Sequence, residues 1–457
     1  MLFSVVRFGI KENTLLSILV AGTRSAVFFA YLPYFSSRMS DSEFSLWLKI
    51  GVITQFVDII HMGLLSTFAR YYSYNETKLL EVIPGLKEER LESIARALFK
   101  THVLVYSGIA LLAFCGSMVY SFALIGEMIR GGHLNGILLF TFLNVSIVVQ
   151  FFGRGLSSLV FGKNKIYLVR WGELGSIIIL IVCIQTMIYF DEFSFGTLVS
   201  VISIQFVLTG LWSVAMTLKV NGNSEANVGD HSFSKSILRN LLRNSIRTGI
   251  GNGLIVGALS IALLLFDRYA EASSTTWMLY RITNSLSVIA QLVFIVSIPI
   301  LTKHFAENKI REFRHTIEIR CILNLLLFIV SGTGAYLWLQ WSSLSLPVES
   351  IRIYSLFLLA WYLFGVGKFI STITNIDNTI RIHYFGSAFL LLTLLMQVMY
   401  FIDLAALVLP ASVLISSLIA LYILGRISIL KNYFRGVIIS DWMVGLCVTS
   451  FIYLTLI

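Results

Sequence analysis

The stretch that decides the fold is residues 134–161, LNGILLFTFLNVSIVVQFFGRGLSSLVF. Its only charged residue is Arg154. A helix of about 20 mostly apolar residues is long enough to cross the ~30 Å hydrocarbon core of a bilayer. The run therefore predicts a transmembrane helix, and similar runs before and after it decide the class of the whole chain.

Apolar runs of this length fill the chain of 457 residues, of which 57% are hydrophobic and 13% charged. A soluble domain carries about 25% charged residues. We therefore expect an all-α polytopic membrane protein with twelve core spans and an extra apolar block at 437–457. The expected spans are 14–37, 46–72, 101–126, 134–161, 171–190, 196–219, 246–267, 276–302, 321–341, 351–376, 384–402 and 404–429.

The basic residues predict the orientation. With a cytoplasmic N-terminus, the inner loops hold 20 lysines and arginines, including those of 78–100 and 303–320. The outer loops then hold only Arg38, Arg130, Arg268 and Arg352. Lys and Arg collect in cytoplasmic loops. The net charge of +10 thus reflects topology and predicts no nucleic-acid partner.

The chain is expected to divide into two halves. Residues 221–230, NGNSEANVGD, have the Asn, Gly and Ser content typical of a linker. The predicted organisation is an N-terminal six-helix bundle (1–220), a cytoplasmic linker (221–245), a C-terminal six-helix bundle (246–430) and an extra C-terminal apolar helix (437–457).

The two halves look duplicated. Residues 152–154 (FGR) match residues 366–368 (VGK), and 171–172 (WG) match 385–386 (FG), all at an offset of 214. Chance similarity among common glycine and aromatic residues is the alternative. Six spans per half give parallel repeats, and transporters built from repeats hold their substrate between them.

Charged residues inside spans are the candidate site residues, because a charge at the bilayer centre costs about 2.5–3.5 kcal/mol. Arg24 is about eleven residues, or ~16 Å, into the first span. Arg154 and Lys368 form the repeat-related pair. Lys49 and Arg281 lie near the outer ends of corresponding spans. For these last four, snorkelling of the long side chain to the interface is the alternative.

Asp58 is the candidate acid, midway through the second span and on one helical face with His61. A carboxylate there suits a coupling proton or sodium ion, or else neutralises Arg24. The four cysteines lie in apolar runs without ligand-like spacing, so no metal site is expected. The sequence has no phosphate-binding loop or hydrolase motif, and no cofactor is expected.

The two six-span halves, residues 56–70 (FVDIIHMGLLSTFAR) and residues 161–166 (FGKNKI) together resemble a family. They are similar to the Wzx-type O-antigen flippases of the multidrug/oligosaccharidyl-lipid/polysaccharide (MOP) exporter superfamily. The resemblance implies a protein of the bacterial inner membrane in lipopolysaccharide and polysaccharide biosynthesis. Its substrate would be an oligosaccharide linked to undecaprenyl pyrophosphate, moved to the periplasmic leaflet by alternating access. A V-shaped cationic cavity between the halves would hold the pyrophosphate, and Arg24, Arg154 and Lys368 fit that role by position.

Two other functions stay open at this point. A MATE-like multidrug or cation antiporter of the same superfamily should show deep carboxylates, of which Asp58 is a single example. A membrane-embedded polysaccharide polymerase or ligase should have a large basic periplasmic loop, and the expected outer loops are short. We therefore expect a transporter and not an enzyme, with membrane lipid, a coupling proton or sodium ion and polysaccharide polymerase machinery as further partners.

Overall fold

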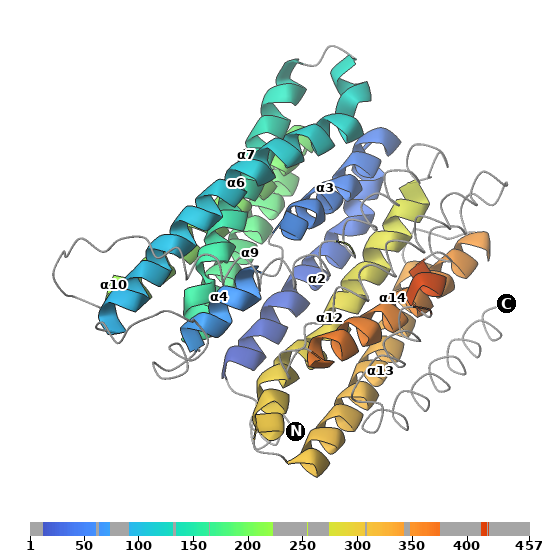
Figure 1. The fold of residues 1–457 in the computed structure, drawn as a ribbon. Coiled ribbons are helices and arrows are strands. Elements are labelled where there is room, and N and C mark those ends of the chain that lie inside the picture. The colour runs from blue at the N-terminus through green and yellow to red at the C-terminus, as the bar shows by residue number, and fades with distance from the viewer. Residues whose placement is uncertain are drawn as a thin grey trace. The chain divides into compact units, whose positions relative to one another are not determined.

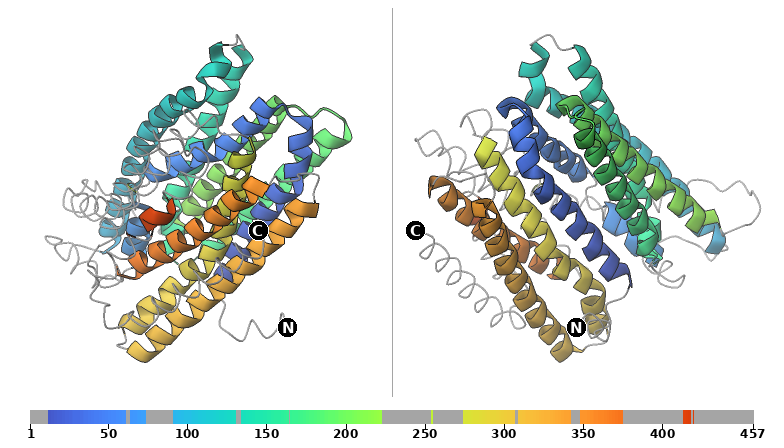
Figure 2. Two further views of the ribbon diagram at one scale, coloured as in Figure 1. Left: turned by 90° about the vertical axis from the view of Figure 1, so that its right-hand side faces the viewer. Right: turned by 180° about the vertical axis from the view of Figure 1, so that it is seen from behind.

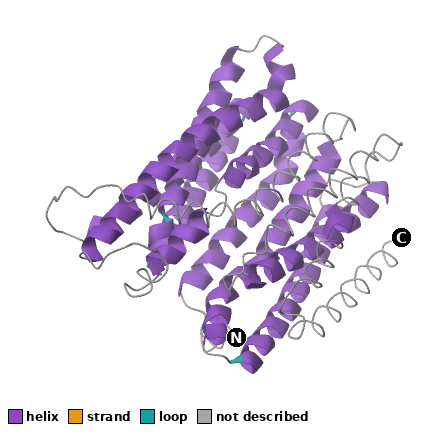
Figure 3. Cartoon of the chain, in the orientation of Figure 1, coloured by secondary structure: helices purple, strands orange, loops and turns teal. Residues whose placement is uncertain are grey.

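The computed structural model describes residues 12–60, 64–73, 91–130, 134–163, 165–222, 254, 274–306, 309–341, 348–374, 413–417 and 419. Within these ranges every regular element is a helix and there is no strand (Figure 3). The predicted all-α class is confirmed. The helices are α2 (Glu12–Arg38), α3 (Asp41–Ile60), α4 (Leu64–Ser73), α6 (Leu91–Arg130), α7 (Leu134–Leu156), α8 (Ser158–Gly162), α9 (Ile166–Tyr189), α10 (Phe195–Gly222), α12 (Ser274–Ala306), α13 (Ile310–Trp341) and α14 (Val348–Thr374) (Figure 1).

Six helices in the described ranges are long and apolar enough to cross a membrane, and a shorter apolar helix covers Ile353–Gly367. The six candidate spans are Leu15–Arg38, Leu98–Val119, Gly136–Gly162, Ile166–Tyr189, Phe195–Asn221 and Arg311–Trp341. Each overlaps a predicted span. The predicted spans 246–267 and 384–402, most of 404–429 and the block 437–457 lie outside the described residues.

Several helices begin earlier than the apolar runs predict: α6 begins at Leu91 against 101 and α13 at Ile310 against 321, and α3 and α9 each begin five residues early. The α3 helix begins at Asp41 because Ser40 and Glu43 cap it: the Ser40 hydroxyl and backbone N–H donate to Glu43 Oε2 at 2.8 and 3.0 Å. The α9 helix begins at Ile166, so Arg170 lies inside the helix and not in the predicted loop. A long cationic side chain in the second turn of a helix still reaches the interface.

The chain forms two compact units. Unit 1 comprises Met1–Thr23 and Ile50–Ile250, and unit 2 comprises Arg24–Lys49 and Gly251–Ile457. The predicted six-span halves differ from these units in placing Arg24–Lys49 with the N-terminal bundle. The duplication itself stays a prediction.

Unit 1 is organised around α7, which packs along both α6 and α10 (Figure 2). Glycines make the α7–α10 contact close, since a Cβ added at Gly153 would overlap the Gly210 carbonyl and one at Gly210 would overlap Val149. Small residues allow this approach of helix backbones in membranes. The α9 helix packs on α10 in a related way, because Gly172 leaves room for the Trp212 ring.

Unit 2 is organised around α12, which packs along α13 and α14. Aromatic rings form much of these contacts: Phe294 of α12 stacks on Phe369 of α14 with ring centres 3.9 Å apart. The hairpin segment Arg24–Lys49 joins this unit through Phe29, whose ring meets Trp338 of α13 edge to face at 5.6 Å. Part of the first predicted hairpin thus belongs to the compact unit that holds α12–α14.

Candidate functional site

A buried carboxylate forms the centre of a polar network in unit 1. Glu173 on α9 is only 3% exposed and is paired with Arg170, one turn earlier on the same helix. The Arg170 guanidinium is also 5.9 Å from the ring centre of Phe161. Burial of a carboxylate is costly unless it is paired and hydrogen-bonded. This pair therefore explains how an acid is kept in an otherwise apolar helix.

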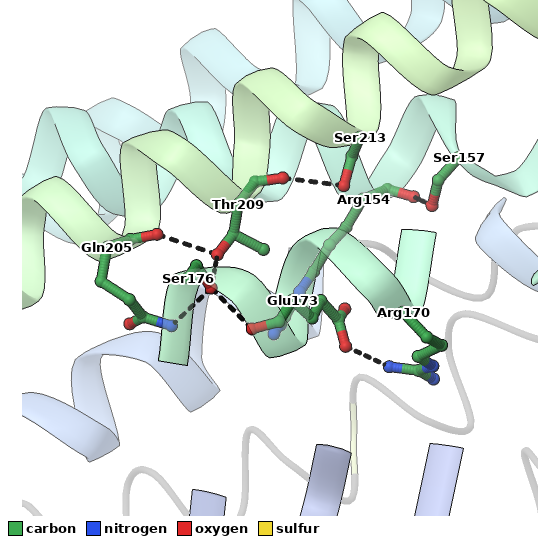
Figure 4. Close-up of polar contacts among 8 residues, drawn as sticks. All are labelled: Arg154, Ser157, Arg170, Glu173, Ser176, Gln205, Thr209 and Ser213. Carbon is green, nitrogen blue, oxygen red and sulfur yellow. Dashed lines mark hydrogen bonds and ion pairs between the residues drawn. The ribbon is translucent and has the colours of Figure 1, made fainter. Parts of the chain in front are cut away.

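Hydroxyl groups extend this network from α9 to α10. The Ser176 hydroxyl donates to the Glu173 carbonyl at 2.8 Å, and the Thr209 hydroxyl is 2.9 Å from Ser176 Oγ. Gln205 Nε2 also reaches Ser176 Oγ, at 3.4 Å. Figure 4 shows the Arg154 side chain extending from α7 towards Glu173 on α9. We call Arg154, Arg170, Glu173, Ser176, Gln205 and Thr209 the Glu173 network.

The Glu173 network gives Arg154 a setting that the sequence analysis did not anticipate. Arg154 was selected as a pyrophosphate ligand, and in the structure it is half-buried and directed towards an acid. Glu173 itself was not selected. The signal that could have found it is the spacing Arg170-x-x-Glu173 within an apolar run, which places opposite charges on one helical face.

A second group of side chains in unit 2 combines cations with aromatic rings. Lys49 Nζ lies 5.9 Å from the ring centre of Trp277, and Arg281 Cζ lies 5.7 Å from that of Phe28. Phe28 in turn stacks on Trp47, with ring centres 5.4 Å apart and planes 19° apart. We call Phe28, Trp47, Lys49, Trp277 and Arg281 the cation–aromatic cluster.

The cation–aromatic cluster contains two of the basic residues that the sequence analysis predicts as site residues. Lys49 comes from α3 and Arg281 from α12, and both belong to unit 2. Arg24 belongs to the same unit, is exposed, and precedes Phe28 by one helical turn on α2. Among the described residues, Arg281 Nε is buried and has no hydrogen-bond partner. A cation over a ring is attracted by the ring's quadrupole, which does not cancel its charge.

The remaining candidates are placed only by their helices. Lys368 lies in α14 and Asp58 in α3, and the positions of both side chains are outside what the structure describes. His61 lies outside the described residues altogether. Their roles in binding the pyrophosphate or a coupling ion stay predictions.

A buried histidine links several helices of unit 1. His102 Nε2 is 3.1 Å from the Gly155 carbonyl, and Nδ1 is 3.0 Å from the Tyr72 hydroxyl. A carbonyl only accepts, so Nε2 carries the proton and Nδ1 accepts from Tyr72. Phe68 stacks on the imidazole with ring centres 4.0 Å apart. With both ring nitrogens occupied, His102 joins α4, α6 and α7, and its role is structural.

Among the described residues, no three His, Cys, Asp or Glu side chains come close enough to hold a metal ion. The arrangement can therefore offer cations, amides and hydroxyls to a ligand, together with one buried, paired carboxylate.

Comparisons with known proteins identify the fold. No family model matches the chain, and no curated protein matches it in sequence. It is similar to the outward-facing structure of a multidrug resistance MATE family transporter of the MOP superfamily, with 14% identity, a TM-score of 0.59 and coverage of 97% of this chain and 96% of that one. The inward-facing structure of such a transporter matches with 14% identity and a TM-score of 0.55, covering 99% of both chains. A MOP superfamily transporter from Pyrococcus furiosus matches with 13% identity and a TM-score of 0.56, covering 96% and 95%.

These matches cover nearly the whole length of both partners. The chain has the MATE-like fold of MOP superfamily transporters, and it is a multi-pass membrane protein. The predicted fold class is confirmed. At 13–14% identity the matches define the fold and not the substrate.

Proposed function

We propose that this protein is a flippase that moves an undecaprenyl-pyrophosphate-linked oligosaccharide from the cytoplasmic to the periplasmic leaflet. The observation that carries the proposal is the setting of Arg281. Its guanidinium lies over the Phe28 ring, and its buried Nε has no hydrogen-bond partner among the described residues. Burial of a cation without full compensation of its charge costs free energy, and a cation kept in such a position is suited to an anionic ligand.

The chemistry of a pyrophosphate fits this setting. Guanidinium groups make strong, often bidentate hydrogen bonds to phosphate oxygens. Lys49 and Arg24 belong to the same compact unit as Arg281 and supply further positive charge. The lipid carrier and the glycan come from the resemblance to Wzx-type flippases, which supports the proposal but does not test it.

The fold is compatible with substrates of different charge. One of the matched structures, the Pyrococcus furiosus transporter, is described as having a binding pocket of reverse polarity that suggests a different function. A MATE-like fold is therefore compatible with a substrate other than the cationic drugs of a multidrug antiporter.

A MATE-like cation antiporter is the second candidate, and one observation favours it. Glu173 is a buried carboxylate inside a membrane helix of unit 1, and such a group is suited to binding a proton or a cation. Its pairing with Arg170 weakens this reading, because the charge of the carboxylate is already compensated.

Deletion of the gene in its host separates the two functions. A flippase deletion should remove surface polysaccharide and cause lipid-linked oligosaccharide to accumulate on the cytoplasmic side. The wild-type gene should restore export, and Arg281→Ala at matched expression should not. Normal polysaccharide together with increased sensitivity to cationic dyes such as ethidium would overturn the flippase and favour the antiporter.

A further inference from the structure

The partly exposed side of α12 differs in chemistry from the exposed faces of other long helices. On α9 the exposed residues include Ile178, Ile179 and Val182, and on α13 they include Ile322, Leu326 and Val330. These apolar faces suit contact with lipid. On α12 the polar groups are half-buried and flank Val288, the one exposed residue among those described in this helix.

Four residues of α12 with helical spacing form this face: Arg281, Asn284, Ser285 and Gln291, with Val288 between them. The four polar side chains are half-buried and Val288 is 49% exposed. Spacings of three, four and seven residues place them on one side of the helix. From Arg281 to Gln291 the face is ~15 Å long, at 1.5 Å per residue.

This face does not suit acyl chains. A polar amide placed in hydrocarbon without a hydrogen-bond partner costs several kcal/mol. The Asn284 side chain makes no hydrogen bond to any other described residue. Polar side chains within membrane spans generally face protein, water or a substrate pathway. We therefore assign this side of α12 to a hydrated or ligand-filled space.

The residue types indicate the class of ligand. An amide offers an acceptor and two donors, so it can bind hydroxyl groups in either sense. The α12 sequence contains no Asp or Glu that could pair with a cationic ligand. Gln291 lies at the α14 edge of this face, beside Gly365, and its Nε2 donates to Ser287 Oγ at 2.7 Å. The neutral, two-way hydrogen bonding of Asn284, Ser285 and Gln291 suits a carbohydrate.

We infer that Asn284, Ser285 and Gln291 bind the glycan of the substrate, while Arg281 at one end of the same face binds its charged phosphate groups. This inference rests on the proposed flippase function and deepens it. It assigns charge recognition and sugar recognition to successive turns of one helix.

Binding to the purified full-length protein tests the inference. The two probes are undecaprenyl-pyrophosphate-linked oligosaccharide, extracted from cells that lack the transporter, and undecaprenyl pyrophosphate without sugar. Asn284→Leu and Gln291→Leu should each raise the Kd for the glycosylated lipid about fivefold to tenfold, since one hydrogen bond contributes roughly 1 kcal/mol. The Kd for the sugar-free lipid should not change. Arg281→Ala should weaken binding of both lipids.

Gln340→Leu is the matched control. It makes the same chemical change in unit 2, at an exposed amide of α13 that bonds only weakly to Tyr336, 3.4 Å away. This variant should bind both lipids like the wild type. Thermal unfolding in detergent checks that each variant is folded. If Asn284→Leu fails to fold, Asn284→Ser carries the same expectation, because serine is too short to make the same contacts.

The outcomes separate the inference from the proposed function. Wild-type Kd values in Asn284→Leu and Gln291→Leu, or equal weakening for both lipids, would overturn the glycan site while leaving the flippase intact. A wild-type protein that binds neither lipid would overturn the flippase and the glycan site together.

Discussion

The Glu173 network and the cation–aromatic cluster both contain arginine, but the charge of the arginine is compensated differently in the two. In unit 1, Arg170 is paired with the carboxylate of Glu173, whose backbone carbonyl accepts from Ser176, and Ser176 in turn accepts from Thr209 of α10. In unit 2, Arg281 lies over the face of a phenyl ring. The carboxylate cancels a full charge and the ring does not. The charge of Arg170 is thus compensated inside unit 1, whereas the charge of Arg281 is not cancelled by the ring, and our proposal of an anionic ligand in unit 2 rests on this difference.

The largest expected effect follows from breaking the ion pair of unit 1. Glu173→Gln keeps the shape of the side chain but leaves Arg170 without its carboxylate. Breaking a buried pair costs about 3–5 kcal/mol, and because Arg170 is 27% exposed we expect roughly 3 kcal/mol. Thermal unfolding in detergent measures the loss.

The double variant Arg170→Gln/Glu173→Gln is the control for that prediction. It removes both charges, so it should unfold closer to the wild type than Glu173→Gln does. A Glu173→Gln protein as stable as the wild type would show that unit 1 does not depend on this pair.

A pair of glycines compares the packing of the two units. In unit 1, Gly153→Ala would force the α7 and α10 backbones apart and should cost about 2 kcal/mol. In unit 2, a Cβ at Gly365 would meet only the Gln291 side chain, at 3.1 Å, which can move. Gly365→Ala should therefore cost under about 1 kcal/mol. Equal losses in the two variants would contradict a closer helix contact in unit 1.

Substitution of Arg281 tests whether the positive charge in unit 2 binds an anionic lipid. Arg281→Ala should weaken binding of sugar-free undecaprenyl pyrophosphate by about tenfold or more, the loss of one charge-assisted hydrogen bond. Arg38→Ala is a matched control, since Arg38 lies over the Tyr34 ring at 5.8 Å but is exposed at the end of α2. If Arg281→Ala and Arg38→Ala bind undecaprenyl pyrophosphate equally well, Arg281 contributes no more to binding this lipid than an exposed arginine does.

The smallest expected effect concerns the ring under Arg281. Phe28→Leu keeps an apolar side chain but removes the aromatic face, which is worth roughly 0.5–1 kcal/mol. We expect a two- to fivefold rise in the Kd for undecaprenyl pyrophosphate, and Phe28→Tyr should behave like the wild type. A Phe28→Leu protein with unchanged affinity would mean that the ring only fills space.

The sequence predicted where the helices lie along the chain better than it predicted which side chains meet between helices. The run 134–161 predicted α7 and α8 almost to the residue, because a bilayer demands long apolar helices and little else. The starts of α3 and α9 were predicted five residues late in each case, 46 against Asp41 and 171 against Ile166. Caps and interfacial cations lie outside the apolar run, so hydropathy does not locate them.

The candidate site was predicted only in part. Lys49 and Arg281 were selected as isolated cations, and neither Phe28 nor Trp277 could be chosen from among 34 Phe and 8 Trp residues. Glu173 was missed because its partner Arg170 was placed in a loop. Contacts between residues hundreds of positions apart, such as Phe28 with Arg281, leave no local pattern in a single sequence.

The sequence by itself determined that this is a helical membrane protein, because chain-wide apolar runs of about 20 residues leave no other stable structure. The sequence also identified the cations within the predicted spans as candidate site residues, because inserting a charge into lipid costs free energy. Only the tertiary structure decided which of those cations meets an acid and which meets a ring. A side chain's charge is a property of its residue type, whereas its compensation depends on neighbours that folding brings from distant helices.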